Sequence, residues 1–287
     1  MSASGFFFAV KPMEEKIAIQ GIKGSFHYQV AQECFGRDIL VDECRTFKGV
    51  IDSLLSGSST SAVMAIENST AGSILPNFAL IDENNIRITG EHYIPIHMDL
   101  MAVPGQKLED ITEVYSHPIA LLQCKNFFED FPEMKLIETS DTAEAARKIS
   151  EKRSLGMAAI AGTVAADLFG LEILSSGIHS MKNNATRFLI LNVGKNGAAP
   201  DKVNKASLKF ELDDHHGSLA SVLNILNDCN LNLSKIQSLP IVETPWKYSF
   251  FVDVTFNKYE EYQKAMGIVK VLTEELKILG EYKNNRK

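Results

Sequence analysis

The sequence has few cysteines, no long apolar run and no excess of positive charge. Its four cysteines are scattered without a C-x-x-C pair, which favours reduced thiols in a cytoplasmic protein. No apolar run approaches the roughly 18 residues that a membrane span needs, and the N-terminal GFFFAV lacks the flanks of a signal peptide. The formal net charge of −7 argues against nucleic acid or an anionic membrane as a partner. An anionic substrate would therefore require a local positive pocket.

The glycine motifs of nucleotide-binding proteins are absent as well. Residues 21–36, GIKGSFHYQVAQECFG, match neither G-x-x-x-x-G-K-[ST] nor G-x-G-x-x-G. Gly21 and Gly24, with Ser25 as a helix cap, instead predict a strand-to-helix turn. The N–H groups at such a helix start could hold a carboxylate or phosphate, and an ordinary turn is the alternative.

Alternating apolar runs and helical patterns from Lys16 to about Val193 indicate an α/β fold. The clearest predicted strands are KIAIQG, SAVMAIEN, ITEVYSHP, LGMAAIAG and TRFLILNV. Ligands of open α/β sheets bind at the carboxyl ends of strands, so polar corners at those ends form the candidate site.

The C-terminal part has a different pattern. Residues 194–205 form a linker rich in Gly, Pro, Lys and Asn, and residues 206–287 follow as a compact unit. Apolar positions from Leu219 to Leu226 predict one amphipathic helix, and those from Tyr262 to Leu276 predict a second. With four predicted strands, the order is β-α-β-β-α-β, which is the ferredoxin-like α+β arrangement.

Two polar corners lie at predicted strand ends. In AIENSTAGSI, residues 65–74, Glu67, Asn68 and Ser69 offer more varied chemistry than a capped turn needs. In VYSHPIALLQC, residues 114–124, Ser116 and Gln123 are two helical turns apart and are expected to face the same side. His117 is either a general base or a capping or packing residue.

The segment NNATRFLIL, residues 183–191, brings a hydroxyl and a cation to the start of a buried strand. Arg187 could bind a carboxylate through two parallel N–H bonds. Thr186 could donate a hydrogen bond or, with assistance, act as an acid. The alternative is a salt bridge with a strand-start hydrogen bond, and Asn184 is either a turn residue or a substrate contact.

Taken together, these corners resemble the prephenate dehydratase family. The matching segments, in order, are GIKGSF, IENSTAG, SHPIALLQC, DTAEAA, AAIAG and NNATRF. The resemblance implies a two-lobed catalytic part, residues 16–193, like a type II periplasmic binding protein. Lobe one is expected at about 16–95 and 178–193, and lobe two at about 96–177. Residues 1–15 would be an N-terminal extension, and residues 206–287 an ACT-type regulatory domain. No chorismate mutase domain fits before Gly21, which implies a monofunctional enzyme.

The family implies a carbon–oxygen lyase that converts prephenate to phenylpyruvate in phenylalanine biosynthesis, with neither cofactor nor metal. It assigns a central part in catalysis to Thr186, and Arg187 completes the same motif. From its chemistry we expect Arg187 to bind a substrate carboxylate. The other catalytic residues that the family implies are Glu67, Asn68, Ser69, Ser116 and Gln123. Gly24, Ser25, Phe26 and Phe188 match family segments and are expected to bind substrate. His117 and Asn184 are expected to do so from their places in the sequence.

The regulatory half departs from the family pattern. GSLA replaces the common GALV, and QSLP replaces ESRP, so Gln237 and Leu239 lose an acid and a base. Phenylalanine as an effector is therefore an open question. The implied effector residues are Gly217, Ser218, Leu219, Ala220, Gln237, Ser238, Leu239 and Pro240. The family also implies a homodimer or homotetramer, and two other readings remain: an arogenate dehydratase, and a non-catalytic amino-acid-binding sensor.

Overall fold

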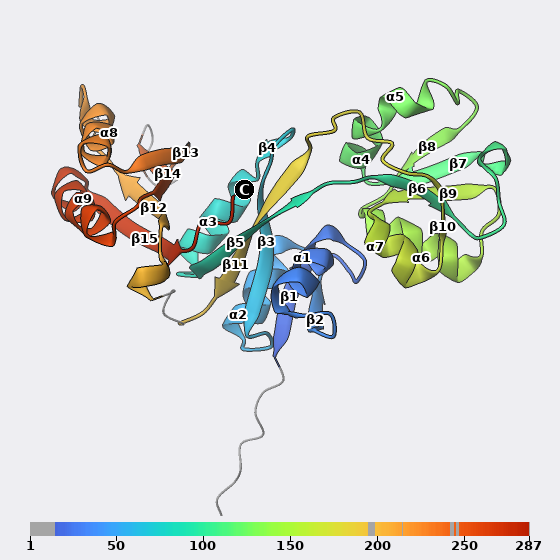
Figure 1. Ribbon diagram of the computed structural model, residues 1–287, viewed down its shortest axis with the longest axis horizontal. Coiled ribbons are helices and arrows are strands. Elements are labelled where there is room, and N and C mark those ends of the chain that lie inside the picture. Colours follow the sequence, from blue (N-terminus) through green and yellow to red (C-terminus); the bar gives the residue numbers. More distant parts are fainter. Residues whose placement is uncertain (1–14, 195–198, 214, 242–243, 245–246, 287) are drawn as a thin grey trace, which may run out of the picture.

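The computed structural model describes residues 15–194, 199–213, 215–241, 244 and 247–286. Apart from Glu15, the expected N-terminal extension lies outside the described residues. Figure 1 shows three parts in a row: lobe one in the middle, lobe two on one side and the C-terminal unit on the other. The chain crosses from lobe one to lobe two after β5 and returns before β11. Within the described residues, no helix has both the length and the apolarity to cross a membrane.

Lobe one is a sheet with helices on both faces. Its elements are β1 (Lys16–Gln20), α1 (Phe26–Phe35), β2 (Leu40–Cys44), α2 (Phe47–Leu55), β3 (Ser61–Asn68), β4 (Gly72–Ser73), α3 (Leu75–Glu83), β5 (Arg87–Pro95) and β11 (Ala185–Asn192). Alternate residues of β3 enter different cores: Val63 packs with Val30 of α1, and Met64 packs with Ile51 of α2. Because both faces of β3 are covered, its sequence is a continuous apolar run.

Lobe two is built on a five-stranded sheet in the order β10-β6-β9-β7-β8. Its elements are β6 (Asp99–Ala102), η1 (Leu108–Asp110), β7 (Glu113–Ser116), α4 (Pro118–Gln123), α5 (Lys125–Phe128), β8 (Lys135–Glu138), α6 (Thr142–Lys152), β9 (Met157–Ala161), α7 (Thr163–Phe169) and β10 (Glu172–Ser175). The small residues of β9 are fully buried and let α6 and α7 pack closely on the sheet. All five predicted strands of the two lobes are confirmed.

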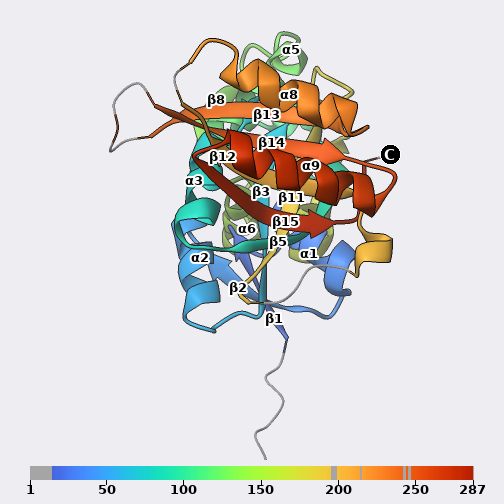
Figure 2. The same cartoon turned by 90° about the vertical axis from the view of Figure 1, so that its left-hand side faces the viewer.

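The C-terminal unit has the predicted βαββαβ order. Its elements are η2 (Pro200–Lys202), β12 (Lys205–Glu211), α8 (Ser218–Asp228), β13 (Asn232–Pro240), β14 (Tyr248–Thr255), α9 (Tyr259–Leu272) and β15 (Glu275–Tyr282). Helices α8 and α9 cover one face of its sheet (Figure 2). The second predicted helix is too long, because α9 ends at Leu272 and Leu276 lies in β15. Leu276 nevertheless packs against the same core as α9, so an apolar residue at this position is compatible with either a longer helix or a strand.

The C-terminal unit continues the sheet of lobe one. Strand β15 runs parallel to β5 with Gly280 opposite Ile88, which gives one ten-stranded sheet in the order β13-β14-β12-β15-β5-β11-β3-β1-β2, with β4 beside β3. A Cβ at position 280 would lie 2.6 Å from Cβ of Ile88, and closer still to its carbonyl oxygen. Phe251 of β14 also packs on Phe78 of α3, with ring centroids 5.4 Å apart. The unit predicted behind a linker is therefore fixed directly to lobe one.

Candidate active site

The candidate site begins with the pairing of β3 and β11. These strands are antiparallel, with Thr186 opposite Asn68 and Arg187 opposite Glu67. Side chains alternate between the two faces of a sheet, so Asn68 and Thr186 share one face while Glu67 and Arg187 share the other. The side chains of the IEN segment therefore lie on both faces of the sheet, and so do those of the TRF segment.

On the first face, five polar residues make up what we call the Thr186 cluster: Asn68, Thr70, Gln123, Asn184 and Thr186. Asn68 Nδ2 donates to Thr186 Oγ1 at 2.9 Å and to Asn184 Oδ1 at 2.7 Å. Gln123 Nε2 donates to Thr70 Oγ1 at 3.2 Å, and Asn184 Nδ2 donates to Gln123 Oε1 at 3.2 Å. Since Gln123 belongs to lobe two and the others to lobe one or its return strand, the cluster joins the two lobes.

The hydroxyl of Thr186 has a free proton. Its oxygen accepts from Asn68, and among the described residues no acceptor takes the hydroxyl hydrogen. Thr186 is 8% exposed, so little solvent competes for that hydrogen. A hydrogen bond received by a hydroxyl polarises it and strengthens its own donation. Among the described residues, the Thr186 hydroxyl hydrogen is therefore not committed to a protein acceptor.

The loop between β3 and β4 is held by Asn68 and Ser69. Asn68 Oδ1 accepts from the backbone N–H groups of Thr70 and Ala71 at 3.0 and 2.8 Å, which is an Asx turn. Ser69 Oγ donates to the carbonyl of Asn183 at 3.1 Å and accepts from the N–H of Ala185 at 3.0 Å. Ser69 thus fastens the strand that carries Thr186, although both of its hydrogen-bonding roles are taken by backbone.

A β-bulge interrupts the pairing of β3 and β11 next to the Thr186 cluster. The register shifts so that Phe188 pairs with Ala65 and Ile66 has no opposite residue. The backbone groups of Ala65 are satisfied by side chains: its N–H donates to Nε2 of His27 at 3.2 Å, and its carbonyl accepts from Asn77 at 2.7 Å. Burial lowers the pKa of His27 from 6.5 to about 3, so its ring stays neutral and can accept.

The lobes also meet at the first glycine corner. A Cβ at Gly24 would lie 3.1 Å from the Phe169 ring of α7, and one at Gly162 would lie 2.9 Å from the Phe26 ring. Gly21 is equally close to a carboxylate, since its Cβ would lie 3.2 Å from Oδ2 of Asp141. Asp141 caps α6 by accepting from the N–H of Glu144 at 2.9 Å, and burial raises its pKa. The starts of α1 and α6 therefore face each other across the contact between the lobes.

The prephenate dehydratase family model matches residues 17–196, which include every residue of this site. The chain belongs to the prephenate dehydratase family. It is accordingly a carbon–oxygen lyase of phenylalanine biosynthesis.

Individual proteins are similar to this chain over most of its length. A bifunctional chorismate mutase/prephenate dehydratase of Buchnera aphidicola subsp. Acyrthosiphon pisum is 34% identical over 271 residues, which cover 93% of this chain and 70% of the relative. The solved prephenate dehydratase of Arthrobacter aurescens in complex with L-Phe has a TM-score of 0.83 at 25% identity, covering 94% of this chain and 90% of that one. A structure described as GqqA, a novel type of quorum quenching acylase, has a TM-score of 0.86 at 26% identity, covering 94% of this chain and 98% of that one.

The dehydratase TRF segment does not use its arginine as predicted. Arg187 is 4% exposed and lies on the face away from Thr186. Its Nε donates to Glu91 at 2.7 Å, its Nη1 to Asp253, and its Nη2 to the hydroxyl of Tyr282 at 2.9 Å. Protein groups occupy each nitrogen of the guanidinium, so in this structure Arg187 is engaged by the protein itself and not directed toward the Thr186 cluster, where a substrate carboxylate was expected.

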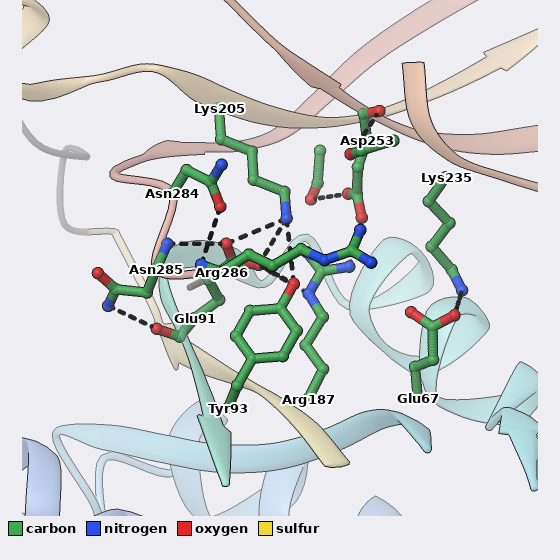
Figure 3. A network of polar contacts seen from close by, with 12 residues as sticks. Glu67, Glu91, Tyr93, Arg187, Lys205, Lys235, Asp253, Asn284, Asn285 and Arg286 are labelled. Carbon is green, nitrogen blue, oxygen red and sulfur yellow. Dashed lines mark hydrogen bonds and ion pairs between the residues drawn. The ribbon is translucent and has the colours of Figure 1, made fainter. Parts of the chain in front are cut away.

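We call this group the Arg187 network; Figure 3 shows its charged members directed toward one another. Lys205 Nζ joins it by donating to Glu91 at 2.8 Å. Burial alone would lower the pKa of Arg187, but the neighbouring Asp253, Tyr282 and Glu91 raise it well above its ordinary value. Burial would likewise raise the pKa of Asp253, and Arg187 holds it below its usual range. Two cationic and two acidic side chains thus stabilise one another between lobe one and the C-terminal unit.

Glu67 also faces the C-terminal unit. Its Oε1 lies 2.8 Å from Nζ of Lys235 in β13, as Figure 3 shows, on the face opposite Asn68. The structure therefore does not bring Glu67 together with Asn68 and Thr186, as the prediction had grouped them. An odd step along a strand reverses the side of the sheet.

Three other predicted residues have structural partners. Ser116 is fully buried and donates to the carbonyl of Ile160 at 2.7 Å, so its hydroxyl lies inside the lobe-two sheet and not beside Gln123. His117 is the N-cap of α4, where Nδ1 accepts from Ile119 at 3.3 Å, as the capping alternative predicts. Phe188 is core, with its ring edge-to-face with His27 at 5.0 Å between centroids.

The structure does not bring Gly24, Ser25 and Phe26 into the Thr186 cluster. Ser25 caps α1 by accepting from Tyr28 at 3.3 Å, as predicted from its position after the glycines. Thr70 and Asp141 were missed as candidates, although both lie in segments that carry the family resemblance. An Asp or Thr at a strand end is equally explained as a cap of the following helix or turn, as Asp141 is for α6. The sequence therefore does not show that these two residues lie where the lobes meet. The described residues include no group of three or more His, Cys, Asp or Glu placed to hold a metal ion.

Proposed function

We propose that prephenate is dehydrated at the Thr186 cluster and that Thr186 protonates the leaving hydroxyl. The observation that carries this proposal is the hydrogen bond from Asn68 Nδ2 to Thr186 Oγ1 at 2.9 Å, which leaves the hydroxyl proton free. Prephenate loses its ring carboxylate as carbon dioxide and its ring hydroxyl as water. The electrons of the broken C–C bond enter the ring as the C–O bond breaks, the departing oxygen takes the Thr186 proton and leaves as water, and a solvent proton restores Thr186.

The protein has two tasks in this reaction. It must hold a dianion, and it must supply a proton to the departing hydroxyl. Aromatisation supplies the driving force, so an acid contributing about 10²- to 10⁴-fold is a substantial share of the catalysis. Gln123 and Asn184 bind each other across the lobes and would fix the distance between Thr186 and the ligand.

The dianion needs a positive partner other than Arg187. Helices α1 and α6 begin on facing sides of the lobe contact, where Ser25 and Asp141 cap them. The first turn of a helix carries a partial positive charge and N–H groups directed outward. We assign a substrate carboxylate to the start of α1, because the Asp141 carboxylate already occupies the start of α6.

The test is kinetic. Purified protein is incubated with prephenate, and the formation of phenylpyruvate is followed for the parent, Thr186→Ala and Thr186→Ser. We expect Thr186→Ala to lower kcat by about 10²- to 10⁴-fold with KM near the parent value, because only the transition state loses the proton donor. Thr186→Ser keeps the hydroxyl and should recover much of that loss. A Thr186→Ala kcat within a few-fold of the parent would remove Thr186 as the acid.

The same assay separates the alternatives. Arogenate differs from prephenate by an amino group in place of the side-chain keto group, so the ratio of kcat/KM for the two substrates identifies the preferred one. A non-catalytic sensor would bind ligand without turning it over. The purified protein is also assayed for acylase activity, because a solved structure similar to this chain is described as an acylase.

We propose further that an amino acid effector binds the C-terminal unit. A cavity of about 140 Å³ is lined by Leu212, Asp213, His215, Ser218, Leu219, Lys247, Tyr248 and Phe250. Two of the predicted effector residues, Ser218 and Leu219, are in this lining. Asp213 offers a negative charge to the ammonium of an amino acid, and Phe250 offers an apolar surface. Lys247 would have to leave its 2.7 Å pair with Glu274 to bind the carboxylate. Repeating the prephenate assay with added phenylalanine tests this.

The free edge of β13 supports the proposed homo-oligomer. Strand β13 is the last strand of the ten-stranded sheet, and its outer edge pairs with no described strand. An unpaired edge is a template for a second chain. Light scattering on the full chain distinguishes monomer, dimer and tetramer.

A further inference from the structure

The two residues that face the C-terminal unit are direct neighbours of the two central site residues. Asn68 follows Glu67 in β3, and Arg187 follows Thr186 in β11. The two pairs lie opposite each other in the strand ladder. The strand pair therefore presents the hydroxyl–amide pair of the site on one face and an acid–base pair on the other.

Glu67 and Arg187 are both held by the C-terminal unit. Lys235 of β13 contacts Glu67 at 2.8 Å, and Asp253 of β14 accepts from Arg187. The Lys235 side chain is only 10% exposed. Its Nζ also donates to Ser73 Oγ at 2.7 Å, and Ser73 in β4 pairs with Glu67. Lys235 thus fastens both strands that flank the loop carrying Ser69 and Thr70.

We propose that Lys235 and Asp253 are positioning residues for the dehydration, acting through Glu67 and Arg187 on the Asn68–Thr186 pair. This inference rests on the proposed function of Thr186. A displacement of about 1 Å in a reacting group can cost about 100-fold in rate. The side chains of Glu67 and Arg187 are fixed to backbone that is shared with Asn68 and Thr186, so their ion pairs limit such displacements.

Another ion pair between the same units, whose Asp82 also lies 3.0 Å from Lys209, provides the control. Lys277 of β15 lies 2.6 Å from Oδ1 of Asp82 in α3, and neither residue is next to a member of the Thr186 cluster in the sequence. If ion pairs simply hold the two units together, losing this pair and losing Glu67–Lys235 should have similar effects. If Lys235 positions the site, only its loss should affect catalysis.

The experiment compares Lys235→Met, Lys235→Arg and Lys277→Met in the full chain, with circular dichroism to measure the folded fraction. For Lys235→Met we expect kcat on prephenate to fall by about 10- to 100-fold while KM stays within about threefold, because the substrate contacts remain. Lys235→Arg should return kcat to within about fivefold of the parent, since it keeps the ion pair. Lys277→Met should leave kcat within about twofold.

Two further variants test the route. Asp253→Asn keeps the shape but removes the charge that faces Arg187, and it should lower kcat with little change in KM. The double variant Glu67→Gln/Lys235→Met should be no slower than Lys235→Met alone, because both changes break the same contact.

The proposal is overturned if Lys235→Met keeps kcat within twofold of the parent, if Lys277→Met lowers it equally, or if Lys235→Arg does not restore it. A different result would mark failure of the proposed function: the parent does not turn over prephenate, or Thr186→Ala stays active. The two failures are distinguishable because the second is read from the parent and Thr186→Ala alone.

Discussion

Thr186 and Arg187 are consecutive residues of β11 whose side chains leave the strand on opposite faces. Thr186 receives a hydrogen bond from Asn68 where the two lobes meet, and Arg187 is buried against Asp253 of the C-terminal unit. One short segment therefore takes part in two different assemblies. A loss of activity on changing Arg187 is consequently no evidence that it touches substrate.

Replacing Arg187 with leucine should damage stability and kcat more than KM. The change leaves Glu91 and Asp253 buried without their cation, and breaking a buried pair in this way costs about 3–5 kcal/mol. Denaturant unfolding measures the loss of stability, and kinetics corrected for the folded fraction separate kcat from KM. Lys48→Met is the control, because its pair with Asp52 on α2 is exposed and contributes about 0.5 kcal/mol or less.

The opposite pattern would contradict this assignment. If Arg187→Leu raised KM strongly while the free energy of unfolding stayed near that of the parent, the guanidinium would bind substrate after all. The stability and kcat of Arg187→Lys should lie between those of the parent and Arg187→Leu, since lysine keeps the charge but cannot reach three partners in the fork geometry of arginine.

The sequence predicted the strands and the members of the Thr186 cluster better than it predicted the face of the sheet on which each side chain lies. Asn68, Gln123, Asn184 and Thr186 were all candidates, and they lie together. Glu67 and Arg187 were also candidates, although strand alternation already predicts that adjacent residues face opposite sides. That simple rule was the available signal for separating them.

The partners of Arg187 could not be predicted from local pattern. Glu91 and Asp253 are 96 and 66 residues away in the sequence, and Asp253 lies beyond the predicted linker. Glu91 reaches Arg187 through the pairing of β5 with β11, whereas Asp253 reaches it because the sheet continues from β5 into β15. For Ser116, the sequence marks a polar strand end but does not tell whether the hydroxyl points inward to a carbonyl or outward to a ligand.

Replacing Gly280 with alanine should open the junction between lobe one and the C-terminal unit. The new Cβ would meet Ile88 at 2.6 Å, and most of the contact is with backbone that cannot rotate away. Overpacking of this kind costs about 1–3 kcal/mol or more. We expect a lower Tm and faster proteolytic cleavage between the two units.

Gly267→Ala is the matched control for this junction. Gly267 lies within α9, and a Cβ there meets no atom within 4 Å. The same substitution should therefore raise stability by about 0.5–1 kcal/mol, because alanine favours helix. Equal effects of the two alanines on Tm would show that the contact at Ile88 is not restrictive.

The last prediction concerns acid stability and His27. Burial lowers the pKa of His27 from 6.5 to about 3, so between these values the unfolded chain binds a proton that the folded chain does not. Stability must then fall as pH falls through this window, and the His27 contribution is constant above 6.5. The slope for one proton is about 1.4 kcal/mol for each pH unit.

His27→Gln keeps an acceptor for the Ala65 N–H but does not titrate, so its stability should depend less on pH by that slope. Urea unfolding at several pH values between neutrality and about 4 measures the difference, with the exposed His216→Gln as control. Parallel curves for the parent and His27→Gln would show that His27 is charged in the fold, and that the Ala65 N–H at the bulge does not depend on its neutral ring.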